Sequence, residues 1–222
     1  MCLATALATR RRPSFARREY PVCVDADAVE LRVLGCLLEK QRTTPDQYPL
    51  SLNGLRLACN QTTNRDPVVS YDEHEIHDAL QRLARRGWTR LASGAGSRAV
   101  KYRHLFDEAL GLDGAETAVL CVLMLRGGQT PGELKARTER MQPFESLGEL
   151  HETLEALIGR ELVARLPRQP GQKEERYVQL LGGAEEAPAA EPERGGDVEE
   201  RLSRLEADVA ALRQAVESLN AP

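Results

Sequence analysis

The chain has 222 residues, of which 41% are hydrophobic, 29% charged and only 4% aromatic, and its formal net charge is −4 at pH 7. A core so poor in aromatics must be built from Leu, Val and Ala, which favours packed helices over a β-sandwich or barrel. No apolar run approaches the roughly 18 residues of a membrane-spanning helix, so no membrane partner is expected. The five cysteines form no Cys-x-x-Cys pair. Their pattern argues against a disulfide framework or a zinc site and predicts a reducing, cytoplasmic location.

Residues 1–24 are strongly basic, with five arginines against one acid. The apolar stretch 2–8 precedes the arginines, whereas in a signal peptide it would follow them. We interpret the segment as a basic, disordered tail. A nucleic-acid-binding arm and a start placed too early in the reading frame are the alternatives.

An internal repeat organises the middle of the chain. Shifts of 86, 74 and 75 residues superpose three blocks in the same order: Val33 on Val119, Leu80 on Leu154, and Tyr102 on Tyr177. Periods of this size are typical of one supersecondary unit used twice. The repeat predicts two tandem domains, at residues 25–110 and 111–181.

The first copy is predicted to contain three helices and a β-hairpin. Its expected elements are helices near residues 29–38 and 50–60, a helix through Ile76, Leu80 and Leu83, and strands at 88–92 and 100–106. Apolar residues at helical spacing identify the helices, and a glycine-rich turn separates the strands. Ser70 and Glu73 fit a capping box at the start of the third helix.

The second copy repeats this order. Its expected elements are helices near residues 115–124 and at 131–141, a helix through Leu150, Leu154 and Leu157, and strands at 162–166 and 176–181. Three helices followed by a hairpin are the order of a winged helix. The predicted fold class is therefore mainly α with small β-hairpins (α+β): two tandem winged-helix domains followed by a C-terminal coiled-coil helix.

Two strings carry a resemblance to a known family. LGCLLEKQRTTPDQYPLSLNGLRLACNQTTNRDPV at residues 34–68 and LRGGQTPGELKARTERM at 125–141 resemble the YceH family of bacterial proteins. The likeness covers about residues 25–181 and implies a tandem winged-helix fold. It supplies no mechanism, because that family has no assigned function and its link to DNA rests on the fold. The Arg-rich start departs from the family's short proteins.

The last 41 residues divide into a linker and a helix. Apart from Arg194, residues 182–196 are Gly, Ala, Glu and Pro, which predicts a flexible acidic linker. Residues 197–219 carry a heptad seam with β-branched or Leu a positions and Leu d positions, which favours a parallel two-stranded coiled coil. The seam residues are Leu202, Leu205, Val209, Leu212, Val216 and Leu219. We therefore expect a homodimer; a helix folded back on its own domain is the alternative.

Catalytic patterns find no support in the sequence. There is no Gly-x-Ser-x-Gly, and the Gly-rich stretch 93–98 lacks the Lys-Ser/Thr of a phosphate-binding loop. His74 and His77 have the spacing of two metal ligands, but no third ligand is apparent, so we interpret them as exposed helix residues. Cys36 and Cys121 lie in apolar helices and are expected in the core. The sequence predicts no enzyme, cofactor or metal.

Nucleic-acid binding has more specific candidates, which are polar or basic side chains of the first copy. They are Asn60, Gln61, Thr63, Asn64 and Arg65 in the connection before the third helix, His74, His77, Gln81 and Arg85 on that helix, and Arg98, Lys101 and Arg103 on the wing. Amides and arginines of this kind reach phosphates or base edges. Turn chemistry in the connection and a solvated strand face on the wing are the alternatives.

Acids at the third helices oppose groove binding. The first starts with Asp72-Glu73-His74-Glu75, and the second carries Glu145, Glu149, Glu152 and Glu155. Acids at a helix start also suit the helix dipole. The sequence predicts a dimeric, non-enzymatic DNA-binding protein acting as a transcriptional regulator, whose second copy meets a protein partner. The alternative is a scaffold, like the tandem winged-helix subunits of chromosome-condensation complexes, without sequence-specific DNA binding.

Overall fold

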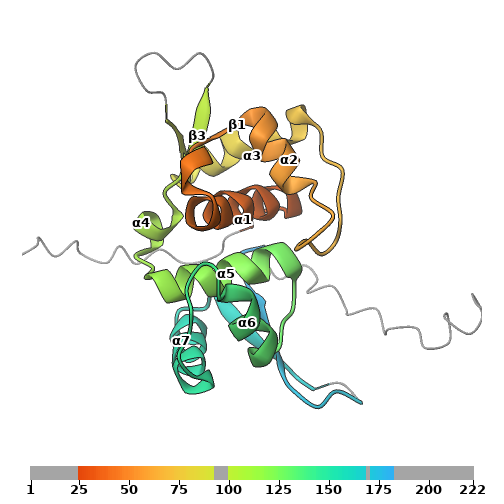
Figure 1. Ribbon diagram of the computed structural model, residues 1–222, viewed down its shortest axis with the longest axis vertical. Helices are drawn as coiled ribbons and strands as arrows, with labels where there is room; N and C mark the ends of the chain where they lie inside the picture. Colours follow the sequence, from red (N-terminus) through yellow and green to blue (C-terminus); the bar gives the residue numbers. More distant parts are fainter. Residues whose placement is uncertain (1–24, 93–99, 169–170, 183–222) are drawn as a thin grey trace, which may run out of the picture.

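The computed structural model describes residues 25–92, 100–168 and 171–182, and the chain passes twice through three helices and a β-hairpin (Figure 1). The first half consists of α1 (Ala28–Thr43), the 3-10 helix η1 (Pro45–Gln47), β1 (Leu50–Ser51), α2 (Leu52–Cys59), α3 (Glu73–Arg85), β2 (Thr89–Leu91), β3 (Lys101–His104) and α4 (Phe106–Leu110). The second half consists of α5 (Gly114–Arg126), α6 (Pro131–Thr138), α7 (Leu147–Gly159), β4 (Val163–Leu166) and β5 (Arg176–Gln179). The fold is mixed α and β, with most of the described residues in helices.

Each half contains a small antiparallel sheet with a third, short edge. In the first half the strand order is β1-β3-β2, with Leu50 opposite Tyr102. In the second half Gln129 and Tyr177 form an isolated bridge beside the β4-β5 pair, through two backbone hydrogen bonds of 3.0 and 2.8 Å. The sequence did not predict these edges, because two residues or one are too short for a periodic pattern.

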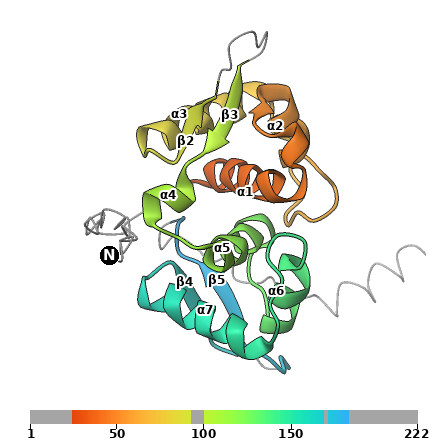
Figure 2. The same ribbon diagram turned by 60° about the vertical axis from the view of Figure 1, so that its left-hand side comes forward.

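The two halves meet along α1 and α5, which lie side by side at the centre of the molecule (Figures 1 and 2). A Cβ atom on Gly35 of α1 would lie 2.9 Å from the Leu125 side chain of α5, so the glycine allows the helices their close approach. Residues 116–125 of α5 are all buried, since α1, α6, α7 and β5 surround the helix. A helix apolar on all sides belongs in such a core.

The start of α3 differs from the prediction. The N-cap is Asp72, whose carboxylate accepts from the N–H of Glu75 at 2.9 Å, while the Glu75 carboxylate accepts from the N–H of Asp72 at 2.8 Å. The predicted capping box of Ser70 and Glu73 was wrong because the chain becomes helical only at Glu73, so Ser70 lies two residues too early. The apolar stripe of α3 is confirmed, with Ile76, Leu80 and Leu83 buried.

The expected strand 100–106 ends early, at His104. Phe106 begins α4, and its ring packs edge-to-face with that of Trp88, with 4.9 Å between ring centroids and 79° between planes. Gly111 then ends α4 in the left-handed conformation, with φ of 61°. The edge-to-face contact fixes Phe106 in the core. The segment 131–141 likewise stops being helical at Thr138.

Several predicted elements lie outside the described residues. They are the tail 1–24, the wing tip with Arg98, most of the linker 182–196, and the coiled-coil segment 197–219. Among the helices that are described, none combines the length and the apolar character needed to cross a bilayer.

Candidate nucleic-acid interface

The first β-hairpin brings three cationic side chains to one face. Arg90 of β2 lies directly opposite Arg103 of β3, and Lys101 lies two residues before Arg103 on the same strand. Opposite partners share a face of an antiparallel pair, as do residues two apart on one strand. We call Arg90, Lys101 and Arg103 the cationic hairpin face; Arg90 is exposed and the other two are partly exposed.

The charge of this face is largely uncompensated. Arg103 pairs with Glu108 at 3.3 Å, and that glutamate is itself 70% exposed. Arg90 and Lys101 form no ion pair with any residue that the structure describes. Like charges directly opposite on a sheet destabilise it by a fraction of a kcal/mol. An arrangement that brings them together is therefore suited to an anion outside the molecule.

Helix α3 presents its predicted outer face to solvent. His74, His77, Gln81 and Arg85 are all exposed. Three of these side chains have partners on the helix: His74 Nδ1 lies 3.1 Å from Asp78 Oδ2, and His77 Nδ1 lies 3.4 Å from Gln81 Nε2. Arg85 has no ion pair within the described part of the chain.

Arg82 of α3 and Arg86, which directly follows the helix, form ion pairs with acidic residues at the start of α1. Arg82 Nη2 lies 2.7 Å from Asp27 Oδ2, and Arg86 Nε lies 3.4 Å from the buried carboxylate of Glu30. These ion pairs fasten the C-terminal end of α3 to α1. The exposed face of α3 therefore has two histidines and one arginine against the acids of its first turn.

Most polar side chains of the connection before α3 form hydrogen bonds within the protein. The Asn60 side chain donates to the Tyr71 carbonyl at 2.8 Å and accepts from the Tyr71 N–H at 2.9 Å. Gln61 Oε1 accepts from Arg65 at 3.1 Å. Thr63 is exposed, and Asn64, with φ of 61°, accepts a hydrogen bond from Arg126 of α5. Turn and packing chemistry explains most of this segment.

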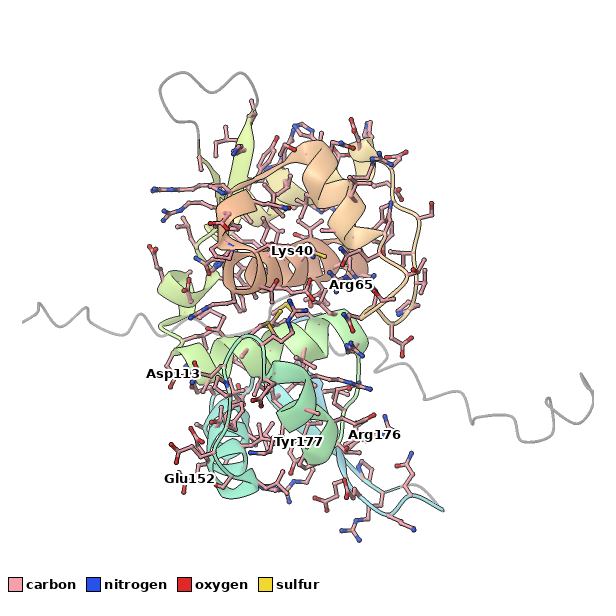
Figure 3. All side chains as sticks on the ribbon, in the orientation of Figure 1. Lys40, Arg65, Asp113, Glu152, Arg176 and Tyr177 are labelled. Atoms are coloured by element: carbon pink, nitrogen blue, oxygen red, sulfur yellow. The ribbon has the colours of Figure 1, made fainter. Side chains whose placement is uncertain are left out.

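The structure corrects the expected position of Arg65, which the sequence placed on the nucleic-acid-binding surface. Its side chain is fully buried between α1 and the connection (Figure 3), where Nη2 and Nη1 lie 2.6 and 3.2 Å from the two carboxylate oxygens of Glu39. Burial alone would lower the pKa of Arg65, but the hydrogen-bonded Glu39 carboxylate raises it above its usual value. The sequence showed a polar string but not which of its side chains turns inward.

The connection also lies against the second half. The Asp66 N–H donates to the Leu125 carbonyl at 2.9 Å, so residues 64–66 contact the end of α5. Figure 1 shows this connection descending from α2 to α5 before it returns to α3. Asn64 therefore belongs to the contact between the halves, and the structure does not bring it together with the outer face of α3.

Arg90 is the residue that the sequence interpretation missed on the hairpin. Strand alternation counted from the buried Trp88 would have placed Arg90, two residues later, on the same buried face. The register instead places Arg90 opposite Arg103. Trp88 still belongs to the turn that follows α3, where its N–H donates to the Leu83 carbonyl at 2.9 Å, and β2 begins only at Thr89, so the alternation of the strand starts there.

The described residues hold no group of three or more His, Cys, Asp or Glu side chains placed to bind a metal ion. The predicted burial of Cys36 and Cys121 is confirmed, and Cys59 is buried with them. Burial raises the pKa of the Cys121 thiol well above its usual value, so the thiol donates a hydrogen bond to the Gly35 carbonyl. These thiols behave as core residues.

Comparisons with known proteins find a family model and two relatives of high sequence identity. The family model described as "Protein of unknown function, DUF480" matches residues 26–172. A "UPF0502 protein" of Opitutus terrae is 53% identical over 188 residues, which cover 83% of this chain and 82% of the relative. A "UPF0502 protein" of Serratia proteamaculans is 48% identical over 204 residues, covering 88% and 95%.

Proposed function

The chain belongs to the DUF480 family of proteins of unknown function, and we propose that it binds duplex DNA through the cationic hairpin face of its first half. The proposal rests on the largely uncompensated charge of Arg90, Lys101 and Arg103, of which only Arg103 has an acidic partner among the described residues. Phosphate contacts supply most of the affinity of non-specific DNA binding, and lysines and arginines make most of those contacts.

The order of the elements supports a winged-helix interpretation of both halves. A helix, a short strand, two helices and a hairpin follow one another from α1 to β3, and the short strand pairs with the second strand of the hairpin. The second half has the same order, with the Gln129 bridge in place of the short strand. In this interpretation α3 is the recognition helix and the hairpin is the wing.

The charges assign different roles to the wing and the helix. Glu73 and Glu75 lie in the first turn of α3, where they repel phosphates, so this turn is unsuited to follow the DNA backbone. His77 and Gln81 lie one turn further along and are exposed, so their side chains are placed to meet base edges. The wing would then anchor the protein on the backbone, and α3 would add discrimination.

The experiment is a titration of a labelled random duplex at two salt concentrations, followed by fluorescence anisotropy. The variant Arg90→Gln with Lys101→Gln should weaken binding to all duplexes alike. The slope of log affinity against log salt should become shallower by about 0.9 for each phosphate that the variant no longer neutralises. The matched control is Arg168→Gln with Lys173→Gln, which removes the same charge from exposed positions of the second hairpin. Failure of the full chain to bind even at low salt would contradict the proposal.

A protein-interaction scaffold is the second candidate, favoured by the acidic surface of α7. Glu149 and Glu152 are exposed on this helix, and Figure 3 shows Glu152 at the outer side of the second half. Glu155 pairs with Arg165 at the start of the second hairpin. A surface of this charge suits a basic protein segment better than DNA. If the duplex titration shows no binding, this function becomes the one to test.

We also propose that the protein acts as a dimer through residues 197–219. Two copies of the cationic hairpin face on one particle would contact two DNA segments, and the combined affinity would exceed that of each face alone. A dimeric DNA-binding protein of this kind is suited to transcriptional regulation.

A further inference from the structure

A second cationic site lies between the two halves, apart from the cationic hairpin face. It is a pocket of about 210 Å³ whose walls come from the end of α1, the connection before α3, the end of α5, and α6. We call it the arginine pocket, because Arg126, Arg137 and Arg140 line it. A volume of this size exceeds the roughly 30 Å³ that one water occupies several-fold, so a phosphate-sized group fits with its hydration.

The pocket has one carboxylate, and that carboxylate is already used. Glu39 lines the pocket, but both of its oxygens accept from Arg65, at 3.2 and 2.6 Å. Its negative charge is therefore matched by a buried guanidinium outside the pocket. The three arginines of the pocket gain little from it.

The pocket arginines lack acidic partners facing the cavity. Arg126 donates to the side-chain oxygen of Asn64, a neutral acceptor. Arg137 pairs with Glu133 one turn back on its own helix, at 3.3 Å, with both side chains about a third exposed. Arg140 forms no ion pair or hydrogen bond with any other described residue. Positive charge is thus in excess at the pocket.

The excess of positive charge affects the pKa of Arg126. Burial lowers its pKa below the usual value, and the nearby charges of Arg137 and Arg65 lower it further. An anion in the pocket would act in the opposite direction and stabilise all three cations. Guanidinium groups present several N–H donors in one plane, an arrangement that matches the oxygens of a phosphate.

We propose that the arginine pocket binds a phosphate group, held by Arg126, Arg137 and Arg140. Its walls belong to both halves, so a bound phosphate would stabilise the contact between α6 and the connection before α3. The chemistry is shared by a free phosphorylated small molecule and by a backbone phosphate of a nucleic acid. The pocket and the cationic hairpin face have no residue in common, so the proposal does not depend on the function proposed above.

The test is calorimetric titration of the full chain with inorganic phosphate and with pyrophosphate, at constant ionic strength balanced by chloride. We expect one site per chain. Arg126→Gln and Arg140→Gln should each lower its affinity about tenfold, since each removes one charge-assisted hydrogen bond. The affinity of Arg140→Lys should lie between those of the unchanged protein and Arg140→Gln, because lysine keeps the charge but lacks the planar set of guanidinium donors. The matched control Arg168→Gln removes an exposed arginine of the second hairpin and should leave the affinity unchanged.

Two results would overturn the proposal: no phosphate-dependent heat or thermal stabilisation beyond that of chloride, or affinity that survives in both glutamine variants. Should Arg126→Gln fail to fold, the exposed Arg140 decides alone. A competition then separates the two sources. A short duplex that displaces phosphate from the Arg90→Gln, Lys101→Gln protein identifies a backbone phosphate, whereas displacement only by a nucleoside monophosphate identifies a small molecule.

Discussion

Gly35 and Cys121, which the 86-residue shift of the repeat makes equivalent, touch each other: the Cys121 thiol donates to the Gly35 carbonyl at 3.3 Å. Their neighbours obey the same relation. A Cβ on Gly35 would meet the side chain of Leu125. Glu39, which the same shift makes equivalent to Leu125, in turn influences the pKa of the Cys121 thiol. Contacts in which i meets j and j meets i are those of a two-fold axis. The two copies therefore pack like the subunits of a dimer within one chain.

This packing makes the two halves one structural unit. Residues 116–125 of α5 are buried, and much of that surface is covered by α1. Cutting the chain after the first half would expose the apolar faces of both helices. Binding experiments on this protein should therefore use the full chain with point variants.

The first prediction concerns the closest approach of the two helices. Gly35→Ala places a Cβ 2.9 Å from the Leu125 side chain and 3.3 Å from the Met124 Cβ. Such overpacking costs about 1–3 kcal/mol, against a gain of about 1 kcal/mol in helix propensity. We expect a net loss of about 1 kcal/mol in the free energy of unfolding, measured by urea denaturation. Gly132→Ala in α6 is the control, because its new Cβ meets nothing within 4 Å; it should be neutral or stabilising. Equal stability of the two variants would contradict the prediction.

The sequence predicted the order of the elements well, because Leu80 and Leu154 and their neighbours repeat at helical spacing. It could not predict that α1 and α5 face each other, since both read as ordinary apolar helices. It placed Lys101 and Arg103 on the wing, and the register added Arg90. The arginine pocket was out of reach, because Asn64 and Arg126 are 62 residues apart and only the folded chain joins them. Long-range pairing of this kind leaves no periodic signal.

The second prediction concerns the ion pair of Glu39 and Arg65. Arg65→Gln leaves the Glu39 carboxylate, which is only 15% exposed, with Lys40 at 3.8 Å in place of the closer Arg65 at 2.6 Å. Breaking a buried pair in this way costs about 3 kcal/mol or more in the free energy of unfolding. Glu39→Gln should cost a similar amount, and the double variant should cost less than the sum, as a double-mutant cycle in urea would measure. Strictly additive losses would show that the two side chains do not stabilise each other.

The third prediction is a loss of stability in mild acid that depends on His104. Burial lowers the pKa of this histidine below its usual 6.5, although Asp107 partly opposes the effect. Below about pH 6.5 the unfolded chain therefore binds a proton that the folded protein does not, so this contribution to stability is lost as the pH falls. The free energy of unfolding should decrease between pH 7.5 and 5.5. It should decrease by less in His104→Gln, whose amide can still donate to Gln41 Oε1, which lies 2.6 Å from His104 Nε2. His151→Gln, an exposed histidine, is the control; an unchanged pH slope in His104→Gln would refute the assignment.

The last prediction concerns the heptad seam, which lies outside the described residues and is carried by the sequence alone. Deleting residues 197–222 should convert a dimer into a monomer in sedimentation equilibrium, because isolated helices of about three heptads are marginal without a partner. Leu212→Asp should act like the deletion, since it places a charge at a d position in the dry seam of each chain. Ala211→Asp adds the same charge one residue earlier, at an outward c position, and should leave the dimer intact.

Oppositely charged g and e positions, such as Arg201 and Glu206, favour the parallel pairing, so exchanging these two charges in one chain only should weaken a mixed dimer. If the deletion leaves the oligomeric state unchanged, a helix that folds back on its own chain is favoured instead.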